Sequence, residues 1–257
     1  MAGAADMIWQ LWNAGEVIDS LPEDLRPHTR DEGYAVQAEL EALSKRPLVG
    51  WKIAATSKAG QHHIGVSGPI AGRLLAQRVF DDGAELAFGA NRMRVAEPEF
   101  AFRFGQALGP REDAYQIDEV LAAVDSLHPA IEVPDSRFDD FASAGEAQLI
   151  ADNACAHEFV LGPATSANWR DIDLSKHEVS VEAVGADQYT GIGSNVLGDP
   201  RVALLWLANE VTGLGLTLDA GHVVTTGTCA EPLEVEPEDE IIMNFGDLGT
   251  VELTFTG

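Results

Sequence analysis

Two glutamates separated by a single proline lie in the stretch "RVAEPEFAFRFG" (residues 94–105), which continues as a hydrophobic, alternating sequence. The alternation predicts a β-strand, in which residues i and i+2 face the same side about 6.6 to 6.8 Å apart. Glu97 and Glu99 would therefore repel each other unless a cation lay between them. For this pair alone, a solvated edge strand that tolerates like charges is the alternative explanation.

A third glutamate, Glu132, occurs in a similar setting in the stretch "HPAIEVPDSRF". It follows apolar residues at a point where a strand should enter the core, and a glutamate is costly to bury there unless it is paired or bound to a metal. Three carboxylates without a thiolate or an imidazole form a hard, oxygen-only ligand set, which favours Mg²⁺ or Mn²⁺ over zinc. Three protein ligands would leave positions open for water or for a chelating substrate.

Lysine is scarce in this chain, so a lysine in an apolar context is informative. Lys52 lies in the apolar stretch "VGWKIAAT" with Gly50 and Ala54 as its period-2 neighbours. This pattern predicts a strand whose Lys52 ammonium approaches the interior. The alternative is a lysine at a strand edge whose charged end extends into solvent.

The composition limits the classes of partner. The 257 residues, 46% of them hydrophobic, predict a soluble globular protein of one large domain or one domain plus a helical extension. The chain has 16 basic and 42 acidic residues, which gives a formal net charge of -26. Such a charge repels nucleic acid and anionic membrane surfaces, and we exclude both as main partners. A small anionic substrate would need a locally positive pocket.

The same sequence predicts a cytoplasmic protein. No apolar run approaches the roughly 18 residues that a membrane helix needs, and the N-terminal residues carry no basic segment of the kind found in secretory signals. Cys155 and Cys229 are too few for a disulfide framework and fit a reducing compartment.

The order of the predicted elements indicates an α+β fold. Residues 1 to about 47 read as helical, with one helix over 6–21 and a second from a Thr29 cap to near Arg46, and residues 48–257 read as β-rich. We expect the helical cap (1–47) and the β-rich domain (48–257) to form one structural unit. Short strands are predicted at 48–56, 99–105, 129–135, 157–162, 178–185, 222–227, 239–245 and 249–255, and helices at 116–127 and 200–215. The last two strands form a hairpin with its turn at residues 246–249.

Six blocks occur in the order expected of one family. They are "GWKIAATSKAGQHHIG", "EPEFAFRFG", "HPAIEVPDSRFDDF", "IADNACAHEFVLG", "VLGDPRVALLWLANEV" and "LDAGHVVTTGTCAEPLEVEPEDEI". From about residue 29 to the end, the chain resembles the 2-oxopent-4-enoate hydratase and 4-oxalocrotonate decarboxylase branch of the fumarylacetoacetate hydrolase superfamily. The resemblance implies helices packed on a mixed β-roll, a 2-oxo acid substrate, and a divalent metal held by Glu97, Glu99 and Glu132. Hydrolases of the superfamily typically present an aspartate as the third ligand, so Glu132 favours a hydratase or a decarboxylase.

The resemblance also implies roles for individual residues. It places Lys52 in the active site, where a lysine neutralises carboxylates and shuttles protons, and Thr228 of "TTGTC" beside the substrate's carboxylate. Gln61, after the lysine block, is expected to line the cleft. Asp152, with Asn153 in "IADNACA", either supports the site or caps a turn; both readings stay open, and we count Asp152 among the candidate substrate-binding residues.

One departure from the family pattern affects the choice of reaction. Members of this branch often carry Pro-Asp-Tyr-Gly shortly after the lysine block, whereas this chain has "GPIAG", with Ile70 and Ala71 in place of the acid and the aromatic residue. The change removes a candidate acid/base and an aromatic wall, and it leaves the substrate's side chain and the choice between hydratase and decarboxylase open.

The sequence thus predicts an Mg²⁺- or Mn²⁺-dependent hydro-lyase that converts a 2-hydroxy-2,4-dienoate into a 4-hydroxy-2-oxo acid. The alternatives are a 2-oxo acid decarboxylase of the 4-oxalocrotonate type, then an acylpyruvate C–C hydrolase, or a non-catalytic partner subunit. The resemblance further implies a homo-oligomer, which in this branch can associate with a downstream aldolase or a decarboxylase. The physiological metal, the oligomer size and the base that activates water are not specified by these residues.

Overall fold

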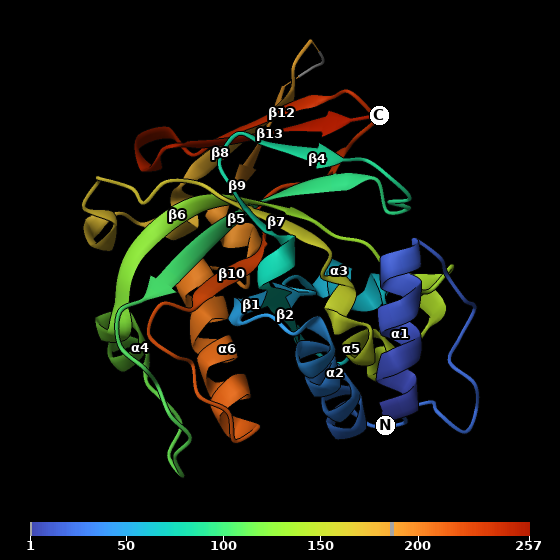
Figure 1. Ribbon diagram of the computed structural model, residues 1–257. Coiled ribbons are helices and arrows are strands. Elements are labelled where there is room, and N and C mark those ends of the chain that lie inside the picture. The colour runs from blue at the N-terminus through green and yellow to red at the C-terminus, as the bar shows by residue number, and fades with distance from the viewer. Residues whose placement is uncertain (1, 186–187) are drawn as a thin grey trace.

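A computed structural model describes residues 2–185 and 188–257 of the protein, and it has the expected α+β architecture. Figure 1 shows a smaller sheet above a larger, curled sheet, with helices below the larger sheet. The helices are α1 (Ala2–Ala14), α2 (Arg30–Ser44), α3 (Lys58–His63), α4 (Ile117–Ala123), α5 (Glu146–Ala151) and α6 (Pro200–Gly213). None of the described helices is long and apolar enough to cross a membrane.

The larger sheet is mixed and holds the strands of the predicted site. Its order is β2-β1-β10-β5-β6-β7-β3, with β11 paired to β5, and the β1–β10 and β7–β3 pairs are parallel. The strands are β1 (Leu48–Ala54), β2 (Ile70–Leu75), β3 (Val79–Asp81), β5 (Val95–Phe104), β6 (Val124–Val133), β7 (Glu158–Leu161), β10 (Val223–Thr228) and β11 (Leu233–Glu234). The outermost strands β2 and β3 are joined by only three residues, the 3₁₀ turn η1 (Ala76–Arg78). The sheet must therefore curl until its two ends come close, which gives the predicted roll.

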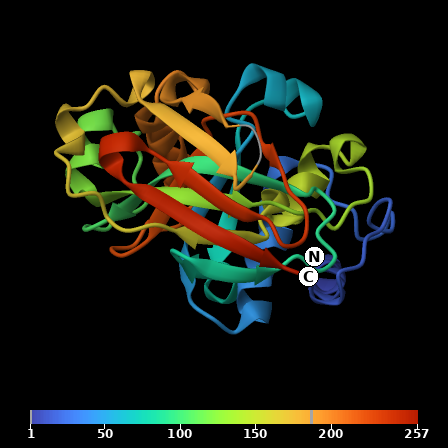
Figure 2. The ribbon, with the colours of Figure 1, turned by 90° about the horizontal axis from the view of Figure 1, so that it is seen from above.

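The smaller sheet covers one face of this roll. Its order is β4-β13-β12-β8-β9, and β13 packs against β6 and β7; Figure 2 looks down on it. The strands are β4 (Ala84–Ala87), β8 (Glu178–Ala183), β9 (Tyr189–Ile192), β12 (Glu240–Asn244) and β13 (Thr250–Thr256). β12 and β13 form the predicted hairpin, with a 3₁₀ turn at Gly246–Leu248. Phe100 of β5 meets Phe245 edge to face at 5.2 Å between ring centroids, so an aromatic core joins the two sheets.

The N-terminal helices share their core with the rest of the chain. Thr29 caps α2 as predicted, in a capping box with Glu32. The apolar cluster under α1 and α2 includes Phe138 and Ala151 from the β-rich part, and Gln37 of α2 donates to the Ala71 and Ile150 carbonyls at 2.8 and 2.9 Å. The helices therefore share core and hydrogen bonds with the rest of the chain, while the predicted division at residue 47 and the single structural unit stay predictions.

Two predicted helices are shorter than the sequence suggested. The first ends at Ala14 rather than near Leu21, because Gly15 takes a positive φ of 66° and Ile18 then pairs with Phe138 in an isolated β-bridge. The second, α4, ends at Ala123, and the residues predicted to complete it start β6 instead. There, pairing with β5 outweighs a local helical pattern.

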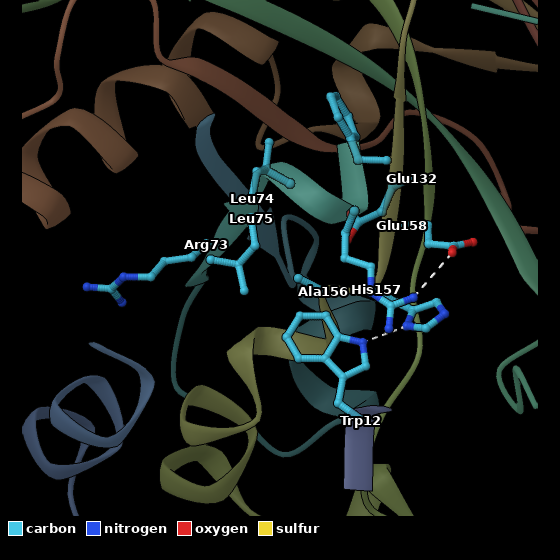
Figure 3. A pocket seen from close by; sticks show the side chains of 10 residues that line it. Trp12, Arg73, Leu74, Leu75, Glu132, Ala156, His157 and Glu158 are labelled. Atoms are coloured by element: carbon cyan, nitrogen blue, oxygen red, sulfur yellow. Dashed lines mark hydrogen bonds and ion pairs between the residues drawn. The ribbon is translucent and has the colours of Figure 1, made fainter. Parts of the chain in front are cut away.

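A side-chain hydrogen bond links the end of α1 to the roll. The indole Nε1 of Trp12 donates to Nδ1 of His157 at 2.8 Å (Figure 3). Arg78 and Arg137 lie over the Trp12 ring. Because an indole N–H is only a donor, Nδ1 of His157 carries no proton. Burial first, and the two arginines second, lower the pKa of His157 to about 3.

We expect His157 to make the fold less stable as the pH falls from about 6.5 toward 3. In that range the unfolded chain, whose histidine has the ordinary pKa near 6.5, takes up a proton that the folded protein excludes. The variant His157→Asn keeps an acceptor for Trp12 without titrating there. Urea unfolding at pH 7, 5.5 and 4.5 should show a smaller loss of stability for His157→Asn than for the wild type, and equal losses would contradict this assignment.

Candidate metal centre

The three predicted carboxylates converge at one end of the roll. β5 and β6 pair antiparallel in a register that places Glu97 directly opposite Glu132, and Glu99 lies two residues further along the same face of β5. One carboxylate oxygen from each residue lies within 4.8 Å of the other two. Glu99 and Glu132 are buried, whereas Glu97 is half-buried and marks the more open side of the cluster.

The end of β10 holds one oxygen of Glu99 in place. Thr225 Oγ1 and the backbone N–H of Gly227, the latter at 2.7 Å, both donate to Glu99 Oε2. The pairing of β10 with β5 is irregular between Thr225 and Thr228, which turns these two donors toward β5. Gly227 has a φ of 95°, and a Cβ there would lie 2.2 Å from Thr56 Oγ1, so only glycine fits.

Lys52 supplies the positive charge beside the carboxylates. Its Nζ lies 2.9 Å from Glu132 Oε1 and donates to the Ala154 carbonyl at 3.0 Å. The contact with Glu132 is an ion pair rather than a well-aligned hydrogen bond, since neither oxygen of Glu132 has a hydrogen-bond partner among the described residues. Lys52 is 3% exposed, which confirms that its ammonium is directed into the interior.

The charges in this cluster change one another's protonation. Burial opposes the charged form of Lys52, but the attraction of Glu132, Glu99 and Glu97 outweighs it and raises the pKa of the ammonium. Burial first and repulsion by Glu132 second raise the pKa of Glu97 to about 7, although Lys52 partly offsets both. The same causes, with repulsion by Glu97, raise the pKa of Glu99 well above its ordinary value.

The donor set fits a hard divalent cation. Within the described part of the chain, Glu99 Oε1 and both oxygens of Glu132 are buried without hydrogen bonds, and such groups are costly unless something binds them. Three ionised carboxylates and one ammonium carry a formal charge of -2, which one divalent cation would balance. Oxygen-only ligands of this kind suit Mg²⁺ or Mn²⁺.

The rear of the cluster is closed by the N-terminal helix. A small cavity of about 10 Å³, roughly the size of one water molecule, is lined by Glu132, Trp12 and His157 among other residues. Figure 3 shows these three side chains around it. A second cavity of about 300 Å³ is lined in part by the same tryptophan and histidine. Trp12 of the N-terminal helix therefore contributes to the walls of both cavities.

The chain takes a strained path next to Lys52. Asn153, Ala154 and Cys155 have φ values of 57°, 53° and 59°, so three consecutive non-glycine residues are left-handed. That conformation costs roughly 1–2 kcal/mol per residue. The turn brings the Ala154 carbonyl to Lys52, and sequence reasoning missed this contact because a backbone oxygen has no residue-type signature.

The remaining predicted site residues have hydrogen-bond partners of their own. Thr228 is the β10 residue opposite Glu99, and its hydroxyl donates to the Ala230 carbonyl at 2.9 Å. Gln61 on α3 is buried and accepts a hydrogen bond from Lys58 Nζ at 3.0 Å. Their contacts with substrate stay predictions.

Asp152 is fully buried, and its carboxylate has protein partners. It accepts hydrogen bonds from Ser136 Oγ at 2.7 Å and the Arg137 backbone N–H at 3.1 Å, and it pairs with the Arg137 guanidinium. These contacts are with Ser136 and Arg137, and the side chain gives no capping hydrogen bond to the described 3₁₀ turn that follows it, so the two readings for Asp152 stay open. Its predicted contact with substrate stays a prediction.

Thr225 and Gly227 were missed as functional residues, although the stretch "TTGTC" that contains them drew attention to Thr228. The hydroxyl that reaches a carboxylate of the cluster belongs to Thr225, three residues earlier. The signal was the Gly227 position itself, since a glycine that interrupts a strand often marks a bulge.

Comparisons with known proteins found a family model and relatives that match most of this chain. The fumarylacetoacetate (FAA) hydrolase C-terminal family model matches residues 74–256. A 2-keto-4-pentenoate hydratase of Paraburkholderia xenovorans (strain LB400) is 31% identical over 98% of this chain and 93% of its own length. A 2-hydroxyhexa-2,4-dienoate hydratase of Comamonas testosteroni is 29% identical over 97% of this chain and 95% of its own length.

A solved structure also matches this chain over nearly its full length. The 4-oxalocrotonate decarboxylase of Pseudomonas putida G7, complexed with magnesium and adipate, is 27% identical with a TM-score of 0.88. The match covers 99% of this chain and 96% of that chain. It confirms the predicted α+β fold of helices packed on curled, mixed sheets.

We expect metal affinity to rise with pH through about 7. Below that pH Glu97 is protonated in the metal-free protein, and binding a cation must first displace the proton. Calorimetric titration with Mn²⁺ at pH 6, 7 and 8, in buffers of different ionisation enthalpy, measures both affinity and proton release. Glu97→Gln should bind more than about 10-fold more weakly with less pH dependence, and an affinity that is constant from pH 6 to 8 in the wild type would contradict the assignment.

Proposed function

The chain belongs to the fumarylacetoacetate hydrolase family, and on that basis we propose that it is a divalent-metal-dependent hydratase. It adds water to a 2-hydroxy-2,4-dienoate, or to its 2-oxo tautomer, and forms a 4-hydroxy-2-oxo acid. The observation that carries this proposal is the cluster of three converging carboxylates beside the Lys52 ammonium. The near full-length similarity to a 2-keto-4-pentenoate hydratase supports it.

Glu97, Glu99 and Glu132 are the residues that would hold the cation. Bound there, Mg²⁺ or Mn²⁺ would supply the positive charge that attracts the substrate's carboxylate and 2-oxygen and stabilises negative charge on that oxygen. Thr225 and Gly227 keep Glu99 Oε2 fixed, and Glu99 Oε1 is the buried oxygen that no group of the described residues hydrogen-bonds. Glu97, the half-buried member, lies where the site is most open.

The reaction protonates two carbon atoms, C5 and then C3, and consumes one water molecule. The 2-hydroxy-2,4-dienoate loses its hydroxyl proton and gains a proton at C5, which leaves a 2-oxo-3-enoate. Water then adds its oxygen to C4 and a proton to C3 and forms the 4-hydroxy-2-oxo acid. Both steps pass through negative charge on the 2-oxygen, so stabilising that oxygen accelerates each of them.

Lys52 is the residue we propose for that oxygen. Its ammonium uses one N–H for the Ala154 carbonyl and lies against Glu132, and an ammonium has three donors. The raised pKa of Lys52 keeps the ammonium protonated, which suits a hydrogen-bond donor to that oxygen. We propose Thr228 as the contact for the substrate's carboxylate, and Gln61 and Asp152 as further substrate-binding residues.

A decarboxylase of the 4-oxalocrotonate type is the second candidate. Loss of CO₂ from a 2-oxo acid with a second carboxylate uses the same stabilised 2-oxygen, and the structural match to a 4-oxalocrotonate decarboxylase favours it. Ile70 bears on this choice, because strand alternation puts it on the same face of β2 as Gly72, which pairs with Lys52. An apolar side chain thus replaces the acid that this branch often carries there.

Assembly and location are also proposals. We infer a homo-oligomer, which can associate with a downstream aldolase or a decarboxylase, and a cytoplasmic location. Light scattering on the purified protein tests the first inference, and a monomer at micromolar concentration would contradict it.

The expected activity is metal-dependent loss of dienoate absorbance. Metal-stripped protein should convert 2-hydroxypenta-2,4-dienoate at least about 100-fold more slowly than protein supplied with Mg²⁺ or Mn²⁺. Product analysis should give the 4-hydroxy-2-oxo acid, whereas release of CO₂ from 4-oxalocrotonate would assign the protein as a decarboxylase. If neither substrate reacts while the metal binds, the proposal is wrong.

Single substitutions inside and outside the carboxylate cluster distinguish a loss of catalysis from a general loss of stability. Glu99→Gln and Lys52→Met should each lower kcat by about 100-fold or more, because each removes a charge that the reaction uses. Glu158→Gln is the matched control: Glu158 is also a buried glutamate, but it pairs with Arg78 outside the cluster. Its kcat should stay close to that of the wild type.

A further inference from the structure

We propose that Asn153 is a positioning residue for Lys52. Its side chain holds the left-handed turn Asn153–Cys155, whose Ala154 carbonyl in turn fixes the Lys52 ammonium against Glu132. The inference rests on the proposed function, because it assigns this turn a part in the same reaction.

The turn is a conformation that the surrounding structure must impose. Non-glycine residues adopt a left-handed backbone mostly as single residues, and here three adopt it in succession. All three are buried, and such strain persists only where neighbouring contacts determine the path of the chain. Strained backbone of this kind occurs preferentially at functional sites.

Asn153 provides the contact that fixes the turn to the sheet. Its Nδ2 donates to the Arg73 carbonyl at 2.9 Å, and its Oδ1 accepts from the Arg73 backbone N–H at 2.7 Å. The side-chain amide thus pairs with β2 as a neighbouring strand would. On its N-terminal side the turn is held by Asp152, which pairs with the buried Arg137.

Gly72 lets the turn and Lys52 pack against the same strand. It is the cross-strand partner of Lys52, and a Cβ at this position would lie 2.4 Å from the Asn153 carbonyl oxygen and 3.0 Å from Lys52 Cδ. Only a residue without a side chain leaves space for both. Gly72 of β2 therefore contacts both Lys52 and the turn whose Ala154 carbonyl holds the Lys52 ammonium.

These contacts determine where the charge of Lys52 lies. A lysine side chain has four rotatable carbon–carbon bonds and would otherwise adopt several positions. One N–H of the Lys52 ammonium donates to the Ala154 carbonyl, and the ammonium lies against Glu132. The other N–H groups of Lys52 are therefore held in the space beside the carboxylate cluster. Precise placement of a donor raises kcat more than it changes substrate binding.

The test relieves the strain and asks whether activity falls. Ala154→Gly removes the penalty for a left-handed residue and frees the turn, and Lys45→Gly does the same at the exposed left-handed residue that ends α2, remote from the carboxylate cluster. Both variants should unfold at a higher urea concentration than the wild type. We expect kcat to fall about 10-fold in Ala154→Gly alone, with KM and Mn²⁺ affinity within about twofold of wild type.

Asn153→Asp is the second variant, because it keeps the size of the side chain but loses the Nδ2 donor to Arg73. It should lower kcat with little change in Mn²⁺ affinity. A structural readout that needs no activity is the set of ε-carbon NMR signals, since the chain has four lysines (Lys45, Lys52, Lys58 and Lys176). The Lys52 signal should shift or broaden in Ala154→Gly and Asn153→Asp and stay unchanged in Lys45→Gly.

The outcomes separate this inference from the proposed function. A wild type that converts no dienoate would overturn the function, while the NMR comparison would still test the position of Lys52. An unchanged Lys52 signal in both turn variants would overturn the inference, as would wild-type kcat in a stabilised Ala154→Gly.

Discussion

The candidate site depends on the approach of three carboxylates, two of them buried and one half-buried, to a single ammonium. Like charges within a few ångströms repel strongly where water is excluded, and the Lys52 ammonium balances only one of the three. A divalent cation would balance the remaining charge, whereas in its absence protonation of Glu97 and Glu99 lowers the repulsion. The repulsion among the three carboxylates makes the metal-free cluster costly, and this repulsion together with the oxygen-only ligands favours a small, hard divalent cation.

The roll brings these groups together from distant parts of the chain. β1 and β6 are separated in the sheet by β10 and β5, yet Lys52 of β1 reaches Glu132 of β6. The curl that closes this distance follows from the three-residue link between the two outermost strands. The helices then complete the enclosure, since Trp12 of α1 lies behind the cavity next to Glu132 (Figure 3).

The charged side chains of the site were predictable from the sequence, but the groups that hold them were not. Each of Glu97, Glu99, Glu132 and Lys52 is a charged residue in an apolar, strand-like context, and this conflict between charge and surroundings is visible in one sequence. The Gly227 N–H and the Ala154 carbonyl belong to the backbone, and their use depends on a bulge and a left-handed turn set by non-local pairing. The premature ends of α1 and α4 have a similar origin, because strand pairing decided them and the local pattern did not.

The most direct measurement is anomalous diffraction at the manganese edge from crystals of the wild type grown or soaked with Mn²⁺. The account predicts one strong anomalous peak between the carboxylates of Glu97, Glu99 and Glu132, and no peak there in a Glu99→Gln crystal prepared in the same way. If the peak lies elsewhere, or if saturating Mn²⁺ leaves the three carboxylates without one, the central claim about this cluster is contradicted.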